Sequence, residues 1–220
     1  MSRRALLLDA GNTIVFLDHG AVADVLGLDP GAVAAAEPVA KRRYEAALRE
    51  GGSHANGWRI FAGELAREAG AEGDLEAAVD ALWAEHQRFN LWRRVQDGFV
   101  DALDRARDLG FRIGVVSNSE GKLPELFEAV GLEGAFEVIV DSAIVGVRKP
   151  DPAIFAMALQ ELDCDAGPSW YAGDLPDVDV VGSRAAGLNA ALIDPLDHYR
   201  GYEDAPRFDS VAALVTSLAP

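Results

Sequence analysis

The chain has 220 residues, of which 50% are hydrophobic and 25% are charged, a composition typical of a globular protein with a buried core. Its formal net charge is −16. This acidic excess argues against nucleic acid and anionic membranes as partners, because both carry negative charge and need a basic protein face. A substrate of the same sign would need local positive charge at its binding site.

Cys164 is the only cysteine, so no intramolecular disulfide can form, and we expect a reducing, cytoplasmic location. The apolar run that follows Arg3 and Arg4 stops at Asp9, which is too short for a secretion signal. No stretch approaches the roughly 18 apolar residues that a membrane span needs. We expect a monomer or a homodimer.

The first predicted element is a buried strand at residues 5–8, a short apolar run, and Asp9 follows it directly. Open α/β sheets bind their ligands at the carboxyl ends of the strands. Asp9 is therefore a candidate nucleophile, because an aspartate carboxylate can attack phosphorus and form an acyl-phosphate. The alternative is an aspartate that caps the turn after the strand.

Residues 16–96 follow this strand, and we expect them to be entirely helical. Amphipathic patterns predict helices at residues 39–48, 58–69 and 75–89. This segment lies between the first strand and all later predicted strands. It should therefore form a helical subdomain that is inserted into the sheet domain.

From residue 97 onward, strands and helices alternate along the chain. We expect strands at 112–116, 136–140, 169–172 and 189–193. Alternation of this kind is typical of a parallel sheet with helices on both faces. The predicted fold is α/β, with a Rossmann-like core of residues 1–15 and 97–220 and a helical insertion of residues 16–96.

Polar residues follow the later strands, as Asp9 follows the first. Ser117 and Asn118 come after one strand, and a hydroxyl with free backbone N–H groups at a helix start binds phosphate well. Lys149 precedes a predicted helix start, and its ammonium would neutralise phosphoryl oxygens. Asp174 follows a further strand, with Asp179 five residues on. Such an acidic pair suits Mg²⁺, which takes one or two carboxylates together with waters and phosphate oxygens.

In this order and spacing, these segments resemble the four motifs of the haloacid dehalogenase superfamily, most of whose members are phosphatases. The resemblance implies that residues 16–96 form a cap over the active site of a hydrolase. It implies a Mg²⁺ site made of Asp9, the backbone carbonyl of Gly11, Asp174 and Asp179. The catalytic residues that it implies are Asp9, Ser117 and Lys149, and the substrate-binding residues are Ser117, Asn118, Lys149 and His19.

One residue departs from the family pattern. Phosphatases of this family usually carry a second aspartate two residues after the nucleophile, where it acts as the general acid/base, and this chain has Gly11 there. Glycine keeps the backbone carbonyl but lacks the carboxyl, whose help is worth about 10²- to 10⁴-fold in rate. His19 is a candidate replacement, because histidine titrates near neutrality. The alternative for His19 is an ordinary surface histidine.

Three functions follow from these motifs. The favoured one is a Mg²⁺-dependent phosphatase that acts on a small phosphorylated metabolite through an aspartyl-phosphate intermediate. The second is a haloacid dehalogenase or a phosphonate C–P hydrolase, for which the missing carboxyl matters less. Dehalogenases of this family, however, usually lack the Gly-Asp at positions 173–174 and carry an aromatic residue at the position of Gly11. The third is a catalytically weak member that binds a phospho-ligand or a protein, which Gly11 favours and the acidic pair opposes.

Overall fold

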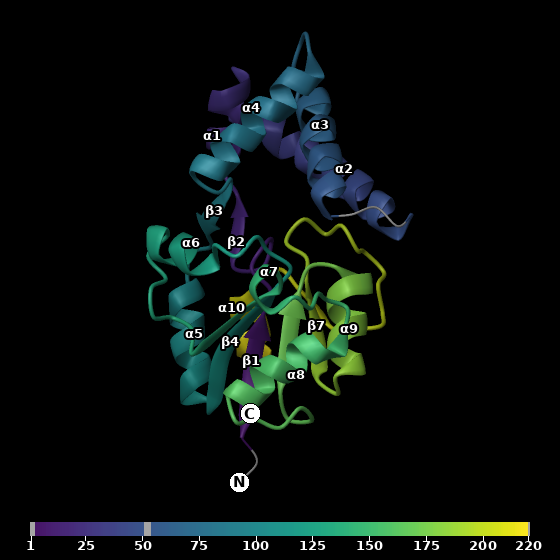
Figure 1. Ribbon diagram of the computed structural model, residues 1–220. Helices are drawn as coiled ribbons and strands as arrows, with labels where there is room; N and C mark the ends of the chain where they lie inside the picture. The colour runs from purple at the N-terminus through teal and green to yellow at the C-terminus, as the bar shows by residue number, and fades with distance from the viewer. Residues whose placement is uncertain (1–2, 51–53, 220) are drawn as a thin grey trace. The chain divides into compact units, whose positions relative to one another are not determined.

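The chain folds into two units, seen in the computed structural model, which describes residues 3–50 and 54–219 (Figure 1). Unit 1 contains the chain up to Phe16 and again from Trp92 onward, and unit 2 is the continuous segment Leu17–Leu91. Unit 2 is therefore an insertion in the sequence of unit 1. The short strands β2 (Val15–Leu17) and β3 (Trp92–Val95) pair with each other where the chain passes between the units.

Unit 1 is built on a six-stranded sheet with the order β5-β4-β1-β6-β7-β8. All neighbouring strands in it are parallel, which confirms the predicted fold class. The strands are β1 (Arg4–Leu8), β4 (Phe111–Ser117), β5 (Val138–Asp141), β6 (Trp170–Gly173), β7 (Asn189–Ile193) and β8 (Arg207–Phe208). Because β1 lies between β4 and β6, the segments that follow these three strands meet at one edge of the sheet.

Helices cover both faces of this sheet (Figure 1). Helix α8 (Pro152–Glu161) packs on the face to which Ala5 and Leu7 point, in one buried cluster that also holds Tyr171. Helix α9 (Val181–Ala185) contacts α8, whereas α5 (Phe99–Asp108) and α10 (Val211–Ser217) contact each other on the other face. The remaining helices of unit 1 are α6 (Leu123–Ala129), α7 (Ser142–Val145) and the π-helical turn η1 (Pro176–Val180).

Unit 2 is helical throughout most of its length. Its helices are α1 (His19–Leu26), α2 (Pro30–Arg49), α3 (His54–Glu68) and α4 (Leu75–Arg88). Three of them begin after an aspartate whose side chain accepts hydrogen bonds from the backbone N–H groups of the first turn; these are Asp18, Asp29 and Asp74. An aspartate at this position stabilises a helix by about 1 kcal/mol.

The structure corrects one expectation for the inserted segment and adds short elements that were not expected. Residues 16–96 are not entirely helical, because β2 and β3 occupy the two ends of that segment. These strands have three and four residues, too few for a periodic pattern to reveal them. The segment after Asp174 forms η1 and then α9, and within it Asp179 accepts a hydrogen bond from the backbone N–H of Leu175. Strand β8 and helix α7 were not expected either, and they have only two and four residues.

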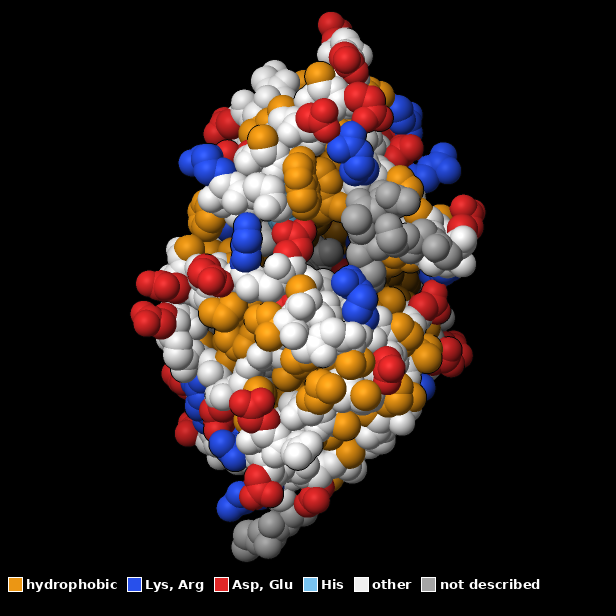
Figure 2. Space-filling view, viewed as in Figure 1, with side chains coloured by type: hydrophobic (Ala, Val, Ile, Leu, Met, Phe, Trp, Pro, Cys, Tyr) orange, Lys and Arg blue, Asp and Glu red, His pale blue; other side chains and the backbone are white. Residues whose placement is uncertain are grey.

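Charged side chains on the surface mix in sign. On the face shown in Figure 2, Lys and Arg side chains are scattered among acidic ones and do not gather in one patch. This distribution agrees with the net charge of −16, which gives acidic groups the majority. None of the helices in the described part of the chain combines the length and the apolar character that a bilayer crossing needs.

Candidate functional site

The predicted site residues of unit 1 come from the carboxyl ends of adjacent strands. Asp9 directly follows β1, Ser117 ends β4, and Asp174 directly follows β6. Asp179 lies in η1, and Lys149 precedes α8. All five side chains are buried. The strand order β4-β1-β6 therefore brings together side chains that lie more than a hundred residues apart in the sequence, such as Asp9 and Lys149.

Lys149 is the centre of the cluster and is only 4% exposed. Its Nζ donates hydrogen bonds of 2.7 Å each to Asp9 Oδ1, Asp179 Oδ1 and Tyr171 Oη. Burial on its own would lower the pKa of Lys149, but the carboxylates of Asp179 and Asp9 outweigh it and raise the pKa above its usual value. The ammonium is thus charged at neutral pH and holds two carboxylates at fixed positions.

Tyr171 is a member of this cluster that the sequence reading missed, because in an apolar strand it looks like a core residue. Its hydroxyl accepts the hydrogen bond from Lys149 and lies 2.9 Å from the carbonyl oxygen of Val116 and 3.2 Å from Asp179 Oδ1. Burial first, and then the neighbouring carboxylates, raise the pKa of Tyr171 well above its usual value. The phenol therefore stays protonated and completes the hydrogen bonds of the ammonium.

The three buried aspartates fit a divalent cation. Asp9, Asp174 and Asp179 each place a carboxylate oxygen within 4.8 Å of the others. Three carboxylates around the single ammonium of Lys149 leave two negative charges, which is the charge that one Mg²⁺ would neutralise. Burial raises the pKa of Asp9, Lys149 opposes the rise, and Asp179 and Asp174 add to it, with a result of about 6. Carboxylate oxygens are the ligands that Mg²⁺ prefers.

Asp179 is fixed by its own loop as well as by Lys149. Its Oδ2 accepts a 2.9 Å hydrogen bond from the backbone N–H of Leu175. Its carboxyl group also lies directly against Gly173, where an added Cβ would stand 2.3 Å from Asp179 Cγ. Glycine at position 173 therefore makes room for the carboxylate of Asp179.

Asn12 is a second residue that the sequence reading passed over, although it lies within the first motif. Its Nδ2 donates to Asp174 Oδ2 at 3.0 Å, and its Oδ1 accepts from Trp92 Nε1 at 3.0 Å. The signal that could have found it is its position three residues after Asp9. Its contact with Trp92 spans 80 residues and could not be read from the sequence.

The other predicted site residues stand as follows. Asn118 binds the backbone of Lys149 at both ends of its amide: its Nδ2 donates to the Lys149 carbonyl at 3.0 Å and its Oδ1 accepts from the Lys149 N–H at 2.8 Å. Ser117 is buried at the end of β4. His19 belongs to unit 2, where its Nε2 lies 2.6 Å from Glu37 Oε2, so its part in the site stays a prediction.

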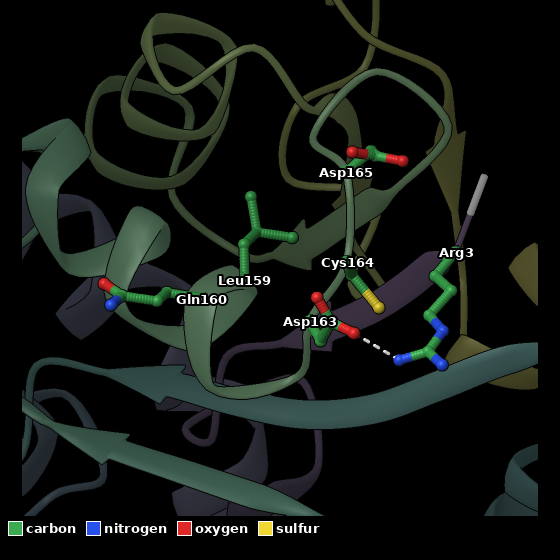
Figure 3. A pocket seen from close by; sticks show the side chains of 6 residues that line it. All are labelled: Arg3, Leu159, Gln160, Asp163, Cys164 and Asp165. Atoms are coloured by element: carbon green, nitrogen blue, oxygen red, sulfur yellow. Dashed lines mark hydrogen bonds and ion pairs between the residues drawn. The ribbon is translucent and has the colours of Figure 1, made fainter.

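A separate pocket of about 370 Å³ lies beside Arg3, which directly precedes the amino end of β1 (Figure 3). Arg3, which precedes β1, forms an ion pair with Asp163 across it. The pocket is lined by Arg3, Leu159, Gln160, Asp163, Cys164 and Asp165. Open parallel sheets bind their ligands at the carboxyl ends of the strands, so the Asp9 cluster is the better candidate for the functional site.

Comparisons with known proteins agree with the predicted family. A family model described as a haloacid dehalogenase-like hydrolase matches residues 3–187. The chain is 31% identical over 126 residues to haloacid dehalogenase-like hydrolase domain-containing protein 3 of Mus musculus, covering 56% of this chain and 50% of the relative. It is 30% identical over 137 residues to the phosphoserine phosphatase of Thermus thermophilus, covering 62% and 53%. The chain thus spans about half the length of these curated relatives.

Solved structures show the same fold. The HAD-hydrolase YfnB from Bacillus subtilis, in a crystal structure bound to magnesium, superposes with a TM-score of 0.74 at 20% identity, over 100% of both chains. The family model covers the chain from before β1 to beyond Asp179, and so includes every member of the buried cluster. The chain belongs to the haloacid dehalogenase-like hydrolase family.

Proposed function

We propose that this protein is a Mg²⁺-dependent phosphatase that hydrolyses a small phosphorylated metabolite through an aspartyl-phosphate on Asp9. The observation that carries the proposal is the hydrogen-bonded cluster of Asp9, Lys149 and Asp179 beside Asp174. It joins a nucleophile, a fixed positive charge and a cation site in one buried place. The phosphoserine phosphatase of Thermus thermophilus among its relatives supports the class of substrate.

The chain's own groups would act in two steps. First, an oxygen of Asp9 bonds to phosphorus, and the ester oxygen of the substrate leaves with its electron pair and takes a proton. Second, water attacks the acyl-phosphate, which releases inorganic phosphate and a proton and restores the carboxylate. Lys149 and the hydroxyl of Ser117 would hold the phosphoryl oxygens, and Asn118 would keep Lys149 in place through its backbone.

The residues that would hold Mg²⁺ are Asp9, Asp174 and Asp179, with the backbone carbonyl of Gly11. When bound, the cation supplies positive charge that offsets the repulsion between the carboxylate nucleophile and an anionic phosphate. We assign the choice of substrate to unit 2, the inserted segment Leu17–Leu91, as a cap.

A screen of phosphorylated metabolites tests this function, with phosphate release measured in Mg²⁺ and in EDTA. We expect release from at least one compound in Mg²⁺ and none in EDTA. Asp9→Asn should reduce it to background, because an amide cannot form the acyl-phosphate but keeps the same shape. The matched control is Asp177→Asn. Asp177 is an exposed aspartate of η1, the turn that also holds Asp179, and this variant should keep its turnover.

Halide release from a 2-haloacid in EDTA would contradict the proposal and favour a dehalogenase. Tight binding of a phosphorylated compound without any release of phosphate would favour a binding protein.

A further inference from the structure

We propose that Asn12 and Trp92 are positioning residues for the Mg²⁺ ligand Asp174, joined to it by a two-step hydrogen-bond relay. The inference rests on the cation site of the proposed function and adds two residues to it. Neither residue touches the reacting atoms in this scheme. Both act by fixing the orientation of a carboxylate.

The donors and acceptors of the relay can be assigned at each step. The indole Nε1 of Trp92 can only donate, and the ionised carboxylate of Asp174 can only accept. The amide of Asn12 stands between them, with Oδ1 3.0 Å from Trp92 Nε1 and Nδ2 3.0 Å from Asp174 Oδ2. Turning the amide over would set its NH₂ against the indole N–H and its oxygen against the carboxylate. The two outer residues therefore hold the amide in one orientation.

The backbone of Asn12 is compatible with the relay. Asn12 has φ 53°, in the left-handed region that glycine adopts without strain and that asparagine tolerates better than most other residues. Both ends of its amide are hydrogen-bonded, one to Asp174 and the other to Trp92. The side chain is therefore held at both ends in a conformation that its backbone allows.

The hydrogen bond from Asn12 fixes one oxygen of the Asp174 carboxylate. Asp174 is buried, and its Oδ2 takes a hydrogen bond from a side chain that is itself held from behind. Residues that orient a metal ligand in this way are typically worth about 10- to 100-fold in metal affinity. We therefore expect the relay to set the affinity for Mg²⁺ rather than the chemistry on phosphorus.

Trp92 lies at the boundary between the two units in the sequence. It is the first residue of β3, and it is also the residue at which the chain returns from unit 2 to unit 1. The relay thus runs from the strand that follows the insertion to the carboxylate of Asp174.

The test is the Mg²⁺ dissociation constant, measured by titration calorimetry on the whole protein. Trp92→Phe keeps an aromatic ring but removes the donor, and Asn12→Gly removes the amide while suiting the left-handed backbone. We expect each variant to bind Mg²⁺ about tenfold more weakly. The double variant should bind no more weakly than Asn12→Gly alone, because the indole acts through the amide. The matched control is Trp83→Phe in α4, which should bind Mg²⁺ like the parent.

Melting of the metal-free variants separates positioning from damage to the fold. If the relay positions Asp174, both variants melt close to the parent, and saturating Mg²⁺ restores any activity that they lose at low Mg²⁺. Dissociation constants within twofold of the parent in both single variants would overturn the inference and leave the phosphatase proposal intact. Weaker Mg²⁺ binding in a protein that releases phosphate from no compound would overturn the phosphatase and leave the relay.

Discussion

Gly11 occupies a position with room for a side chain. An ideal Cβ built on it meets no other heavy atom within 4 Å, and Gly11 is not among the residues with positive φ. Neither space nor backbone conformation therefore requires glycine here. The effect of glycine at this position is chemical. It leaves no carboxyl two residues after Asp9 that could protonate a leaving group.

We expect Gly11→Asp to raise the rate on alkyl phosphates more than the rate on aryl phosphates, by up to about 10²-fold in their ratio. An alkoxide needs a proton as it leaves, whereas an aryl oxide does not. The ratio of kcat/KM for one alkyl and one aryl phosphate measures this effect. Gly11→Asn is the control, since it has the same size but no proton to give. An unchanged ratio with normal Mg²⁺ binding would mean that another group already supplies the proton.

Asp9 should make Mg²⁺ binding depend on pH. In the metal-free protein, burial raises the pKa of Asp9 from 3.8 to about 6. Below that pH the carboxyl carries a proton that Mg²⁺ must displace, so the affinity should fall by about tenfold per pH unit below 6 and level off above it. Calorimetric titrations between pH 5 and pH 8 measure this dependence. An affinity that is flat across this range would show that Asp9 does not bind the cation.

The same pKa has a consequence for stability. A carboxyl whose pKa is higher in the folded state than in the unfolded state stabilises the fold while it is protonated. The metal-free protein should therefore lose this contribution as the pH rises through about 6. Mg²⁺ should stabilise the protein most above that pH, where the carboxylates are ionised.

At the scale of elements, the turn between β6 and η1 is packed closely around the carboxylate of Asp179. We expect Gly173→Ala to destabilise the protein by about 1–3 kcal/mol, because its Cβ would stand 2.3 Å from Asp179 Cγ. The displaced carboxylate should also weaken Mg²⁺ binding. Urea unfolding measures the first effect, and calorimetry the second. Gly167→Ala is the control, since a Cβ there meets nothing within 4 Å. Equal stabilities for the two variants would contradict the tight contact.

The sequence predicted helices and strands that have a regular hydrophobic pattern. It missed residues whose role depends on contacts with residues far away in the chain. Strand β7 was predicted at its observed bounds. Asp9 and Lys149 were expected in one site because their motifs resemble those of a known family, and the structure brings the two side chains into contact. Asn12 and Trp92 were not linked, because 80 residues separate them and no local pattern joins an amide to an indole. Tyr171 was missed for a related reason, since a buried tyrosine in a strand has the same sequence pattern whether or not its hydroxyl meets a lysine.

At the scale of the molecule, the two units have different proposed roles. Unit 1 would bind the cation, and unit 2 would contribute to the choice of substrate. All proposed Mg²⁺ ligands belong to unit 1, whereas His19 belongs to unit 2. If His19 contacts the substrate, His19→Asn should raise KM about tenfold, the size of one lost hydrogen bond to a charged group, and leave the Mg²⁺ dissociation constant unchanged. Steady-state kinetics and calorimetry measure the two quantities.

Glu37→Gln is the control for this prediction, because Glu37 is the partner of His19 within unit 2. An equal rise of KM in that variant would assign the effect to the packing of unit 2 rather than to a contact of His19.

The position of β1 in the sheet also bears on how the chain is made. Strand β1 is flanked by β4 and β6, and its Leu6, Leu7 and Leu8 are completely buried in the folded protein. During synthesis this strand leaves the ribosome before either neighbour, and unit 2 must follow before Phe111 begins β4. Its leucines therefore lack their partner strands through the period in which the helices of unit 2 form, which exposes this segment of the nascent chain to aggregation.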